Sequence, residues 1–536
     1  MSGKQTFLHG AVILMAANII VKIIGAVFRI PIYNLIGGEG WSYYQTAYNF
    51  YVSFFVISTA GLPIAISRMT AVAVSRENYE EEKKIFKLAL IIFITAGIIG
   101  SGTMAACARI FTESVKIPNA RISVLILAPA LFFVCVTFCF RSYFQGRQNM
   151  IPTAVSEVIE SLGKLLIGVS AAVYAIGKGY DSHIVSALAA SGLTVGVAAG
   201  VIYLCFVKLI TKKRETAEKT GRGGTARKNS AIIGEIIKIA APITLSAFLI
   251  SLSPLIDTFT MPSRLIDAGF TLEAAQKVYG DYAAQAMSLF NFPNVLVTPF
   301  AMSILPVLSM AFANGDIPVI KSTVESTFRV VSIISVPCAL GIIVMAEPIL
   351  GLLFTNEEAV ESTAPLVSVL AAAVVLSAMT AVTNSMLQAQ KQERKTIISI
   401  GCGIAVKLIS SYILTGRPEI NKFGTPISTI LCYLTIMSLN FWFLAKYTGI
   451  TPPVRRVFVK PLISGAGMSV CTVLVYRVSK NLLDGSRAAV IPAILTAVAV
   501  YIILILILKT LKREDILLLP KGAKIYAFMK NKNFID

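Results

Sequence analysis

The amino-acid sequence predicts an all-α membrane protein with about 14 transmembrane helices. Three observations support this fold class. The 536 residues include 56% hydrophobic and only 14% charged side chains, the mean hydropathy is +0.76, and long apolar runs alternate with polar breaks along the chain. A soluble domain carries about 25% charged residues, so lipid is the expected solvent for most of this chain.

Fourteen apolar runs are long enough to cross a bilayer, which takes about 20 helical residues. In chain order they cover approximately residues 8–36, 45–74, 85–108, 122–140, 152–177, 183–207, 233–256, 282–312, 322–346, 363–387, 396–415, 425–445, 457–476 and 488–508. The first run contains Lys22 and Arg29 and lacks a small-residue cleavage site, so we interpret it as a retained helix and not as a signal peptide.

Lysine and arginine are distributed unevenly between the connections. If the N-terminus is cytoplasmic, the inside segments hold 30 of the 48 Lys and Arg residues and the outside segments hold 11. The positive-inside rule therefore predicts that both termini are cytoplasmic. Anionic membrane lipids account for the net charge of +20 without a nucleic-acid partner.

A weak internal repeat indicates two pseudo-symmetric lobes of six helices. Gln145–Leu166 aligns without a gap on Gln388–Ile409, a shift of 243 residues that places Lys164 on Lys407. Six crossings return the chain to the same side, which predicts a parallel repeat about an axis along the membrane normal. We predict an N-lobe (1–207), a basic cytoplasmic linker (208–232), a C-lobe (233–447), two further helices (448–510) and a basic cytoplasmic tail (511–536).

Signatures of catalysis are missing from the sequence, so we expect no enzyme activity and no cofactor. There is no GxxxxGK(S/T), HExxH or GxSxG motif. The eight cysteines have no CxxC spacing and nearly all fall within apolar runs, which indicates buried fillers and not a metal centre. A membrane synthase or ligase is the enzymatic alternative, but its acidic candidates Glu357, Glu358 and Glu361 fit a solvated helix edge better.

Charged residues inside the predicted spans are the first functional candidates. They are Lys22, Arg29, Arg68, Lys164, Lys238, Arg329 and Lys407. A charge at the centre of a bilayer costs about 2.5–3.5 kcal/mol on insertion scales, so it usually faces a polar cavity or a partner. Lys22 and Arg29 are seven residues apart and share one helix face. With Arg68 of the second helix they would form a ladder across the membrane.

Ordinary structural roles are open for some of these cations. Arg29 and Arg68 could extend to lipid headgroups, and we interpret Lys238 and Arg329 in that way because both lie near cytoplasmic helix ends.

Lys164 has two readings of equal weight. Glu157, Glu160 and Lys164 share one helix face, and Glu160 precedes Lys164 in the order that favours an ion pair. A self-neutralised pair and a cavity role are therefore both open. Its repeat equivalent Lys407 lacks these carboxylates and is the better cavity candidate.

Prolines in three predicted spans indicate helices that bend. Pro63 lies in the second span, Pro242 in the seventh, and Pro293, Pro299 and Pro306 in the eighth. Each removes a backbone hydrogen bond and makes bending easier, as a gate would need. Static kinks are the alternative.

Three motifs, together with this helix arrangement, resemble a known family. They are VKIIGAVFRIPIYNLIGGEG (Val21–Gly40), TAGLPIAISRM (Thr59–Met69) and SRLIDAGFTLEAAQKVYGDY (Ser263–Tyr282). They are similar to the stage V sporulation protein B and polysaccharide-biosynthesis branch of the MOP flippase superfamily, to which the MurJ-type lipid II flippases are related. The resemblance covers essentially the whole chain, although Lys22 stands where those proteins tend to have arginine.

The resemblance implies a MATE/MOP-like fold and a function in the bacterial cytoplasmic membrane. That function is the flipping or export of undecaprenyl-pyrophosphate-linked saccharides, such as lipid II, by alternating access with a cationic central cavity. The last two helices would form a groove for the lipid tail, and cell-wall synthesis enzymes would fit as partners beside membrane lipids. By resemblance the substrate-binding residues are Lys22, Arg29, Arg68 and Arg264, and the charge argument adds Lys407 and Lys164.

A cation-coupled multidrug antiporter of the MATE type is the alternative function. Such a protein needs a buried carboxylate for Na⁺, H⁺ or a cationic drug. The first two predicted helices contain none, which leaves Asp257, Glu157 and Glu160 as substitutes.

Overall fold

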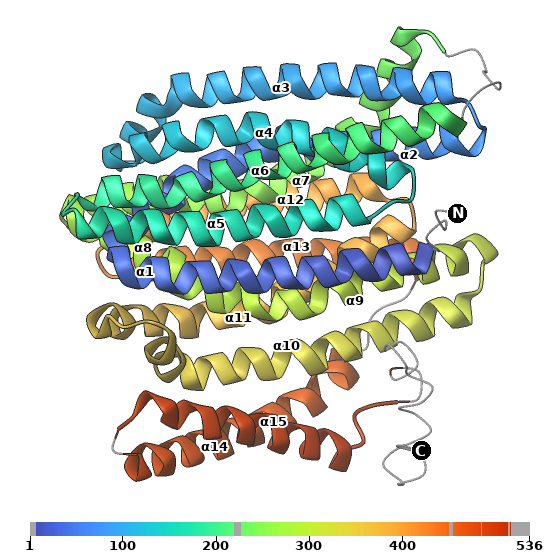
Figure 1. Ribbon diagram of the computed structural model, residues 1–536. Helices are drawn as coiled ribbons and strands as arrows, with labels where there is room; N and C mark the ends of the chain where they lie inside the picture. The colour runs from blue at the N-terminus through green and yellow to red at the C-terminus, as the bar shows by residue number, and fades with distance from the viewer. Residues whose placement is uncertain (1–6, 219–226, 450–453, 484, 513–514, 516–536) are drawn as a thin grey trace. The chain divides into compact units, whose positions relative to one another are not determined.

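The computed structural model describes residues 7–218, 227–449, 454–483, 485–512 and 515, and these are nearly all helical. The α-helices are α1 (Phe7–Thr59), α2 (Leu62–Ser75), α3 (Tyr79–Ser114), α4 (Arg121–Gly146), α5 (Ile151–Gly177), α6 (Ser182–Glu218), α7 (Asn229–Asp267), α8 (Leu272–Asp281), α9 (Met287–Asn314), α10 (Ile317–Leu353), α11 (Glu357–Ala389), α12 (Glu393–Thr415), α13 (Gly424–Thr448), α14 (Val454–Leu482) and α15 (Val490–Ile507) (Figure 1). The predicted all-α class is confirmed.

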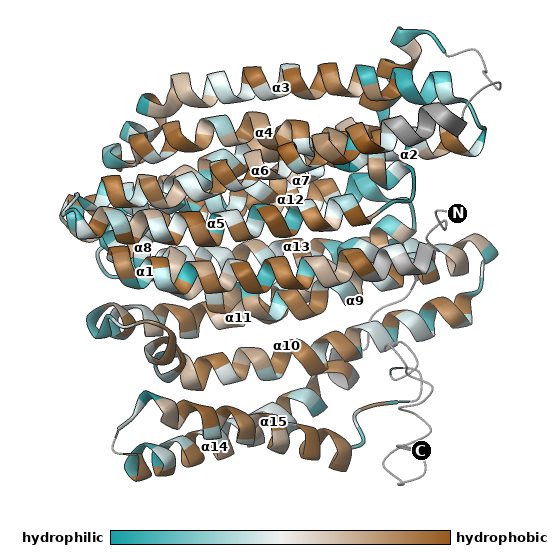
Figure 2. Ribbon diagram, viewed as in Figure 1, coloured by the Kyte–Doolittle hydropathy of each residue, from teal (hydrophilic) through white to brown (hydrophobic). Residues whose placement is uncertain are grey.

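Thirteen helical segments of the described residues are long and apolar enough to cross a membrane. Hydrophobic residues run along these helices and hydrophilic residues gather at their ends and connections (Figure 2). The chain is therefore a multi-pass membrane protein. The first segment, Ile13–Ser75, contains the first two predicted spans, so the number of about 14 crossings stays a prediction, as does the orientation of the termini.

A glycine interrupts α1 between the first two predicted spans. Gly37 has φ 67° and ψ −173° inside an otherwise helical run, a conformation open almost only to glycine. The chain changes direction there, and residues on either side of the break meet: the rings of Phe28 and Tyr44 lie 5.7 Å apart, centroid to centroid. The second half of α1 thus packs against the first half.

The second predicted span, 45–74, is also interrupted. Ala60 and Gly61 separate α1 from α2, and Pro63 stands in the first turn of α2. A proline in this position loses no intrahelical hydrogen bond and favours a helix start. Pro63 therefore begins a helix, whereas the sequence predicted a bend within one. The other singled-out prolines lie inside helices, Pro242 in α7 and Pro293, Pro299 and Pro306 in α9.

The helices form two compact units. The first contains the chain up to Ser263 together with Phe270–Gly280, and the second contains Arg264–Gly269 and the chain from Asp281. In the first unit α5 packs against α6, α4 against α3 and α6, and α1 against α4 and α5. In the second unit α12 packs against α13, α11 against α9, α10 and α13, and α14 against α10 and α15. Residues 219–226 of the predicted linker and nearly all of the predicted tail lie outside the described residues, and the lobe boundaries stay a prediction.

Each unit has its own apolar core. Phe140, Tyr143 and Phe144 of α4 pack with Leu204 of α6 in the first unit. The core of the second unit joins α9, α10, α11 and α13 through Leu308, Phe328, Met386 and Phe443. These helices are buried on one side and exposed on the other, as expected of helices that face both protein and lipid.

Two expectations from the sequence are wrong. Arg329 does not extend to headgroups: it is 6% exposed, and its Nε and Nη2 lie 2.6 Å and 2.8 Å from the Asp515 carboxylate oxygens. The partner follows α15 in the chain, and its distance in sequence concealed the pair. Cys402 is not a buried filler, since it is exposed on α12, whereas Cys135, Cys139 and Cys432 are buried.

We expect Gly37→Ala to lower stability by about 1–3 kcal/mol, because a Cβ is strained in this backbone conformation. The measurement is thermal unfolding of the purified protein in detergent. Gly102→Ala is the matched control: Gly102 is helical and a Cβ there meets nothing within 4 Å, so the same substitution should stabilise by about 0.5–1 kcal/mol. Equal shifts in the two variants would contradict the account of the α1 break.

Candidate functional site

The cations of α1 occupy different surroundings. Lys22 is exposed, whereas Arg29, two turns later, is partly buried. The guanidinium carbon of Arg29 lies 5.5 Å from the centroid of the Trp41 ring. This contact depends on the break at Gly37, because Trp41 belongs to the half of α1 that folds back. The cation–π geometry favours a charge that is removed from water.

Lys164 of α5 lies among aromatic rings of α1. Its ammonium nitrogen is 4.7 Å from the ring centroid of Phe28, 4.9 Å from that of Tyr48 and 5.9 Å from that of Tyr44. Arg29 contacts the Trp41 ring, which lies 5.1 Å from the Tyr44 ring that Lys164 contacts, centroid to centroid. Arg29 and Lys164, from two helices of one unit, are therefore the pair of predicted site residues that the structure brings together.

An aromatic column along α1 forms the surroundings of this pair. Trp41, Tyr44, Tyr48, Tyr51 and Phe55 follow one another at spacings of three and four residues, so they share one helix face. Successive ring centroids lie 5.1, 6.1, 6.1 and 6.0 Å apart. Trp41, Tyr44 and Tyr51 are buried, and α1 packs against α4 and α5. The column thus lines the packed side of α1.

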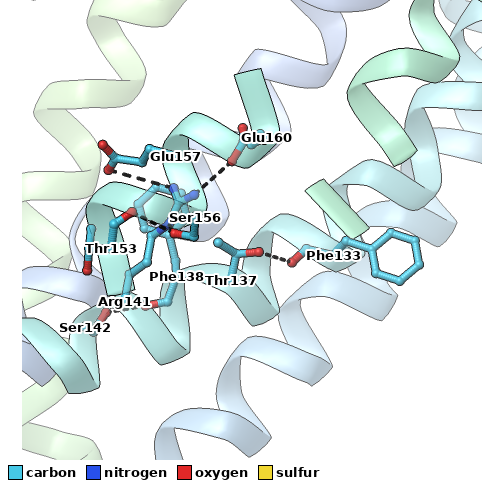
Figure 3. Close-up of polar contacts among 9 residues, drawn as sticks. All are labelled: Phe133, Thr137, Phe138, Arg141, Ser142, Thr153, Ser156, Glu157 and Glu160. Atoms are coloured by element: carbon cyan, nitrogen blue, oxygen red, sulfur yellow. Dashed lines mark hydrogen bonds and ion pairs between the residues drawn. The ribbon is translucent and has the colours of Figure 1, made fainter. Parts of the chain in front are cut away.

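Arg141 of α4 is a buried charged residue that the sequence interpretation left out of the site. It is 5% exposed; its Nη2 donates to Glu160 Oε2 at 3.0 Å and its Nε to Ser156 Oγ at 2.8 Å, while Nη1 lies 4.0 Å from Glu157 Oε1. Figure 3 shows the guanidinium between these side chains of α5. The two adjacent carboxylates on one helix face were the signal for such a partner.

The ion pair of Arg141 with Glu160 takes away the partner that the sequence suggested for Lys164. Glu160 was predicted as the partner of Lys164 in one of two readings, and that reading is wrong because Glu160 pairs with Arg141. In the part of the chain that the structure describes, the Lys164 ammonium makes ring contacts but neither a hydrogen bond nor an ion pair. Its positive charge is therefore left without a bound carboxylate.

Buried donors add to the anion-binding character of this region. The Trp41 Nε1 and Tyr44 hydroxyl groups are buried and find no hydrogen-bond partner among the described residues. Buried polar groups are normally satisfied, and an exception calls for an explanation such as a ligand. Both groups can donate to an anion, and both belong to rings that surround Arg29 or Lys164.

The other predicted site residues lie elsewhere. Arg68 is exposed on α2 of the first unit. Arg264 and Lys407 belong to the second unit. Arg264 Nη1 binds the Asp267 carboxylate at 2.6 Å, and Nε donates to the Tyr412 carbonyl at 3.1 Å; Lys407 is 1% exposed on α12. A single cavity that collects all six cations stays a prediction.

Two solved transporters share this fold. An inward-facing MATE family transporter of the MOP superfamily aligns with a TM-score of 0.67 at 15% identity, over 80% of this chain and 94% of that one. The lipid II flippase MurJ in an inward closed conformation aligns with a TM-score of 0.64 at 14% identity, over 93% of this chain and 98% of that one. The chain therefore has the same fold as these MATE and MurJ structures.

The family follows from sequence comparison. Residues 7–312 match the family described as polysaccharide biosynthesis protein, and residues 282–413 match MatE. Stage V sporulation protein B of Bacillus subtilis is 24% identical over 96% of this chain and 98% of its own length. The lipid II flippase MurJ of the same organism is 25% identical over 84% of each chain. The first of these matches covers more than half of the chain, so the chain belongs to the polysaccharide biosynthesis protein family.

We expect Arg141→Met to destabilise the protein by about 3–5 kcal/mol, because it leaves two carboxylates of α5 without their buried cation. The measurement is thermal unfolding in detergent. Arg109→Met is the control: Arg109 pairs with Glu113 at 2.8 Å, but both side chains are more than half exposed, and exposed pairs contribute little. If the two variants unfold at the same temperature, the contacts of Arg141 with Glu157 and Glu160 do not stabilise the fold.

Proposed function

We propose that this protein flips undecaprenyl-pyrophosphate-linked saccharides, lipid II or a related precursor for cell wall, spore cortex or polysaccharide, to the outer leaflet of the cytoplasmic membrane. The observation that carries the proposal is the pair of cations, Arg29 and Lys164, held among aromatic rings of a membrane-spanning unit. The relative named as a lipid II flippase supports the same class of substrate.

A diphosphate group suits this pair on physical grounds. Arg29 and Lys164 carry like charges beside neighbouring rings, and an anion bound between them would interact favourably with both. Charge-assisted hydrogen bonds are shorter and stronger than neutral ones, and charges interact more strongly away from water. Trp41 and Tyr44 would supply neutral donors to the same anion.

The membrane potential would drive outward transfer. Each negative charge that leaves a negative cytoplasm gains about 2.3 kcal/mol per 100 mV. Alternating access between the two predicted lobes would then need no nucleotide site, in keeping with a sequence that has no phosphate-binding loop. We also propose that both termini lie in the cytoplasm.

A cation-coupled multidrug antiporter is the second candidate, favoured by the MATE fold and by Asp257, a carboxylate of α7 that is 4% exposed. The other two acidic candidates fit less well, because Glu157 and Glu160 both face Arg141. Loss of drug resistance in Asp257→Asn, together with a wild-type protein that does not flip the lipid, would favour this function over the first.

We expect Lys164→Met to slow flipping at least about tenfold, because one charge-assisted contact is worth about 1.5–3 kcal/mol. Methionine keeps the length and the ring contacts but removes the charge. The measurement is the rate at which labelled lipid II becomes accessible on the outer side of proteoliposomes.

Lys178→Met is the control for this experiment. Lys178 lies at the end of the same helix and is exposed, so its substitution should leave the rate unchanged. Unchanged flipping by a folded Lys164→Met protein would show that Lys164 does not bind the substrate. Arg29→Gln should slow flipping in the same direction as Lys164→Met.

A further inference from the structure

An apolar groove of about 430 Å³ lies between the α1–α2 junction and α7. Ile57 of α1 and Leu62 of α2 form one wall, and residues of α7 such as Ile237, Leu245 and Phe248 form the other. All of these elements belong to the first unit and to segments that can cross a membrane. The volume falls in the range of ligand sites, about 300–1,000 Å³.

A close backbone contact holds the walls of this groove together. A Cβ on Gly61 would lie 2.2 Å from the Ala240 carbonyl oxygen, so only glycine permits this approach. The Gly61 N–H donates to the Thr244 hydroxyl at 3.1 Å. Since Ala240 and Thr244 themselves line the groove, the helices are fixed to each other beside it.

Two exposed cations lie on the helices that form the walls of the groove, Arg68 on α2 and Lys238 on α7. Arg68 follows Leu62 by six residues, about 9 Å along α2, and Lys238 directly follows Ile237 on α7. Both side chains are exposed, and neither forms an ion pair or hydrogen bond within the described ranges.

The end of α2 and the start of α7 lie on the same side of the unit. Arg227, two residues before α7, pairs with Glu81 in the first turn of α3 at 2.5 Å, and α3 follows α2 after three residues. Arg227 also pairs with Glu235 at 2.6 Å. The nearest acid on α7 is thereby occupied, which leaves Arg68 and Lys238 as two uncompensated positive charges.

We propose that this groove binds the apolar chain of a diphosphate-linked lipid while Arg68 and Lys238 contact the diphosphate. The apolar walls match a hydrocarbon chain, and the two cations match a headgroup with more than one negative charge better than the single charge of a phosphodiester lipid. This inference rests on the proposed function and assigns a docking site distinct from the Arg29 and Lys164 pair.

The groove is tested by filling it. We expect Ala241→Phe, a change at an exposed residue of the lining, to weaken binding of tritiated undecaprenyl diphosphate about tenfold in phosphatidylcholine nanodiscs. Binding of inorganic pyrophosphate should stay unchanged, because it has no chain. Ala106→Phe, at an exposed position of α3, should bind both ligands as the wild type does.

The cations are tested by a second variant. Arg68→Gln combined with Lys238→Gln removes two exposed charges, so folding should be kept, and we expect about a tenfold loss for undecaprenyl diphosphate with no change for the uncharged undecaprenol. Equal affinity of wild type and Ala241→Phe would overturn the proposal. So would displacement of the probe by phosphatidylglycerol at equal concentration, which would make the groove a general lipid site.

The same measurements separate this inference from the proposed function. If the wild-type protein binds no undecaprenyl diphosphate, the proposed function fails and the docking site fails with it. If the wild type binds the lipid and Lys164→Met weakens pyrophosphate binding, while Ala241→Phe changes nothing, the proposed function stands and the docking site alone is overturned.

Discussion

A charge placed inside a membrane must be compensated, and this constraint organises the first unit. Arg141 is compensated by the carboxylates of α5. Lys164 is surrounded by aromatic rings, and Arg29 lies against the ring of Trp41; such rings stabilise a cation without neutralising it. These surroundings exist because Gly37 lets α1 fold back on itself. A local backbone conformation thus places two cations beside the aromatic rings of α1.

The helices could be predicted from the sequence because lipid requires a long apolar run in every membrane-spanning helix, whatever that helix packs against. The change of direction near Gly37 falls between the first two predicted spans. The sequence did not show how abrupt this change is, because one glycine residue makes it where we expected a connecting segment. The break at Gly61 and the role of Pro63 were missed for a related reason: apolar residues continue on both sides, and hydropathy does not report backbone continuity.

The site was harder to predict because ion pairs are chosen in three dimensions. Spacing correctly placed Glu160 and Lys164 on α5, but it could not show that α4 extends to Gly146 and brings Arg141 to the same carboxylate. The pair of Arg329 and Asp515 could not be predicted either, because the two residues are far apart in the sequence. The aromatic column was readable in the spacing from Trp41 to Phe55. Such stripes are common in helix packing, however, and only the position of Lys164 gives this one a role.

The two tryptophans of this chain make the site visible to spectroscopy. Trp41 is buried against Arg29, whereas Trp442 is 56% exposed on a membrane-spanning segment, so a quencher attached to the lipid chains would reduce the emission of Trp442 and not that of Trp41. The remaining emission comes from a ring within 5.5 Å of a guanidinium, and indole fluorescence responds to the local electric field. The protein therefore carries an intrinsic optical probe of the charge state of its own membrane interior.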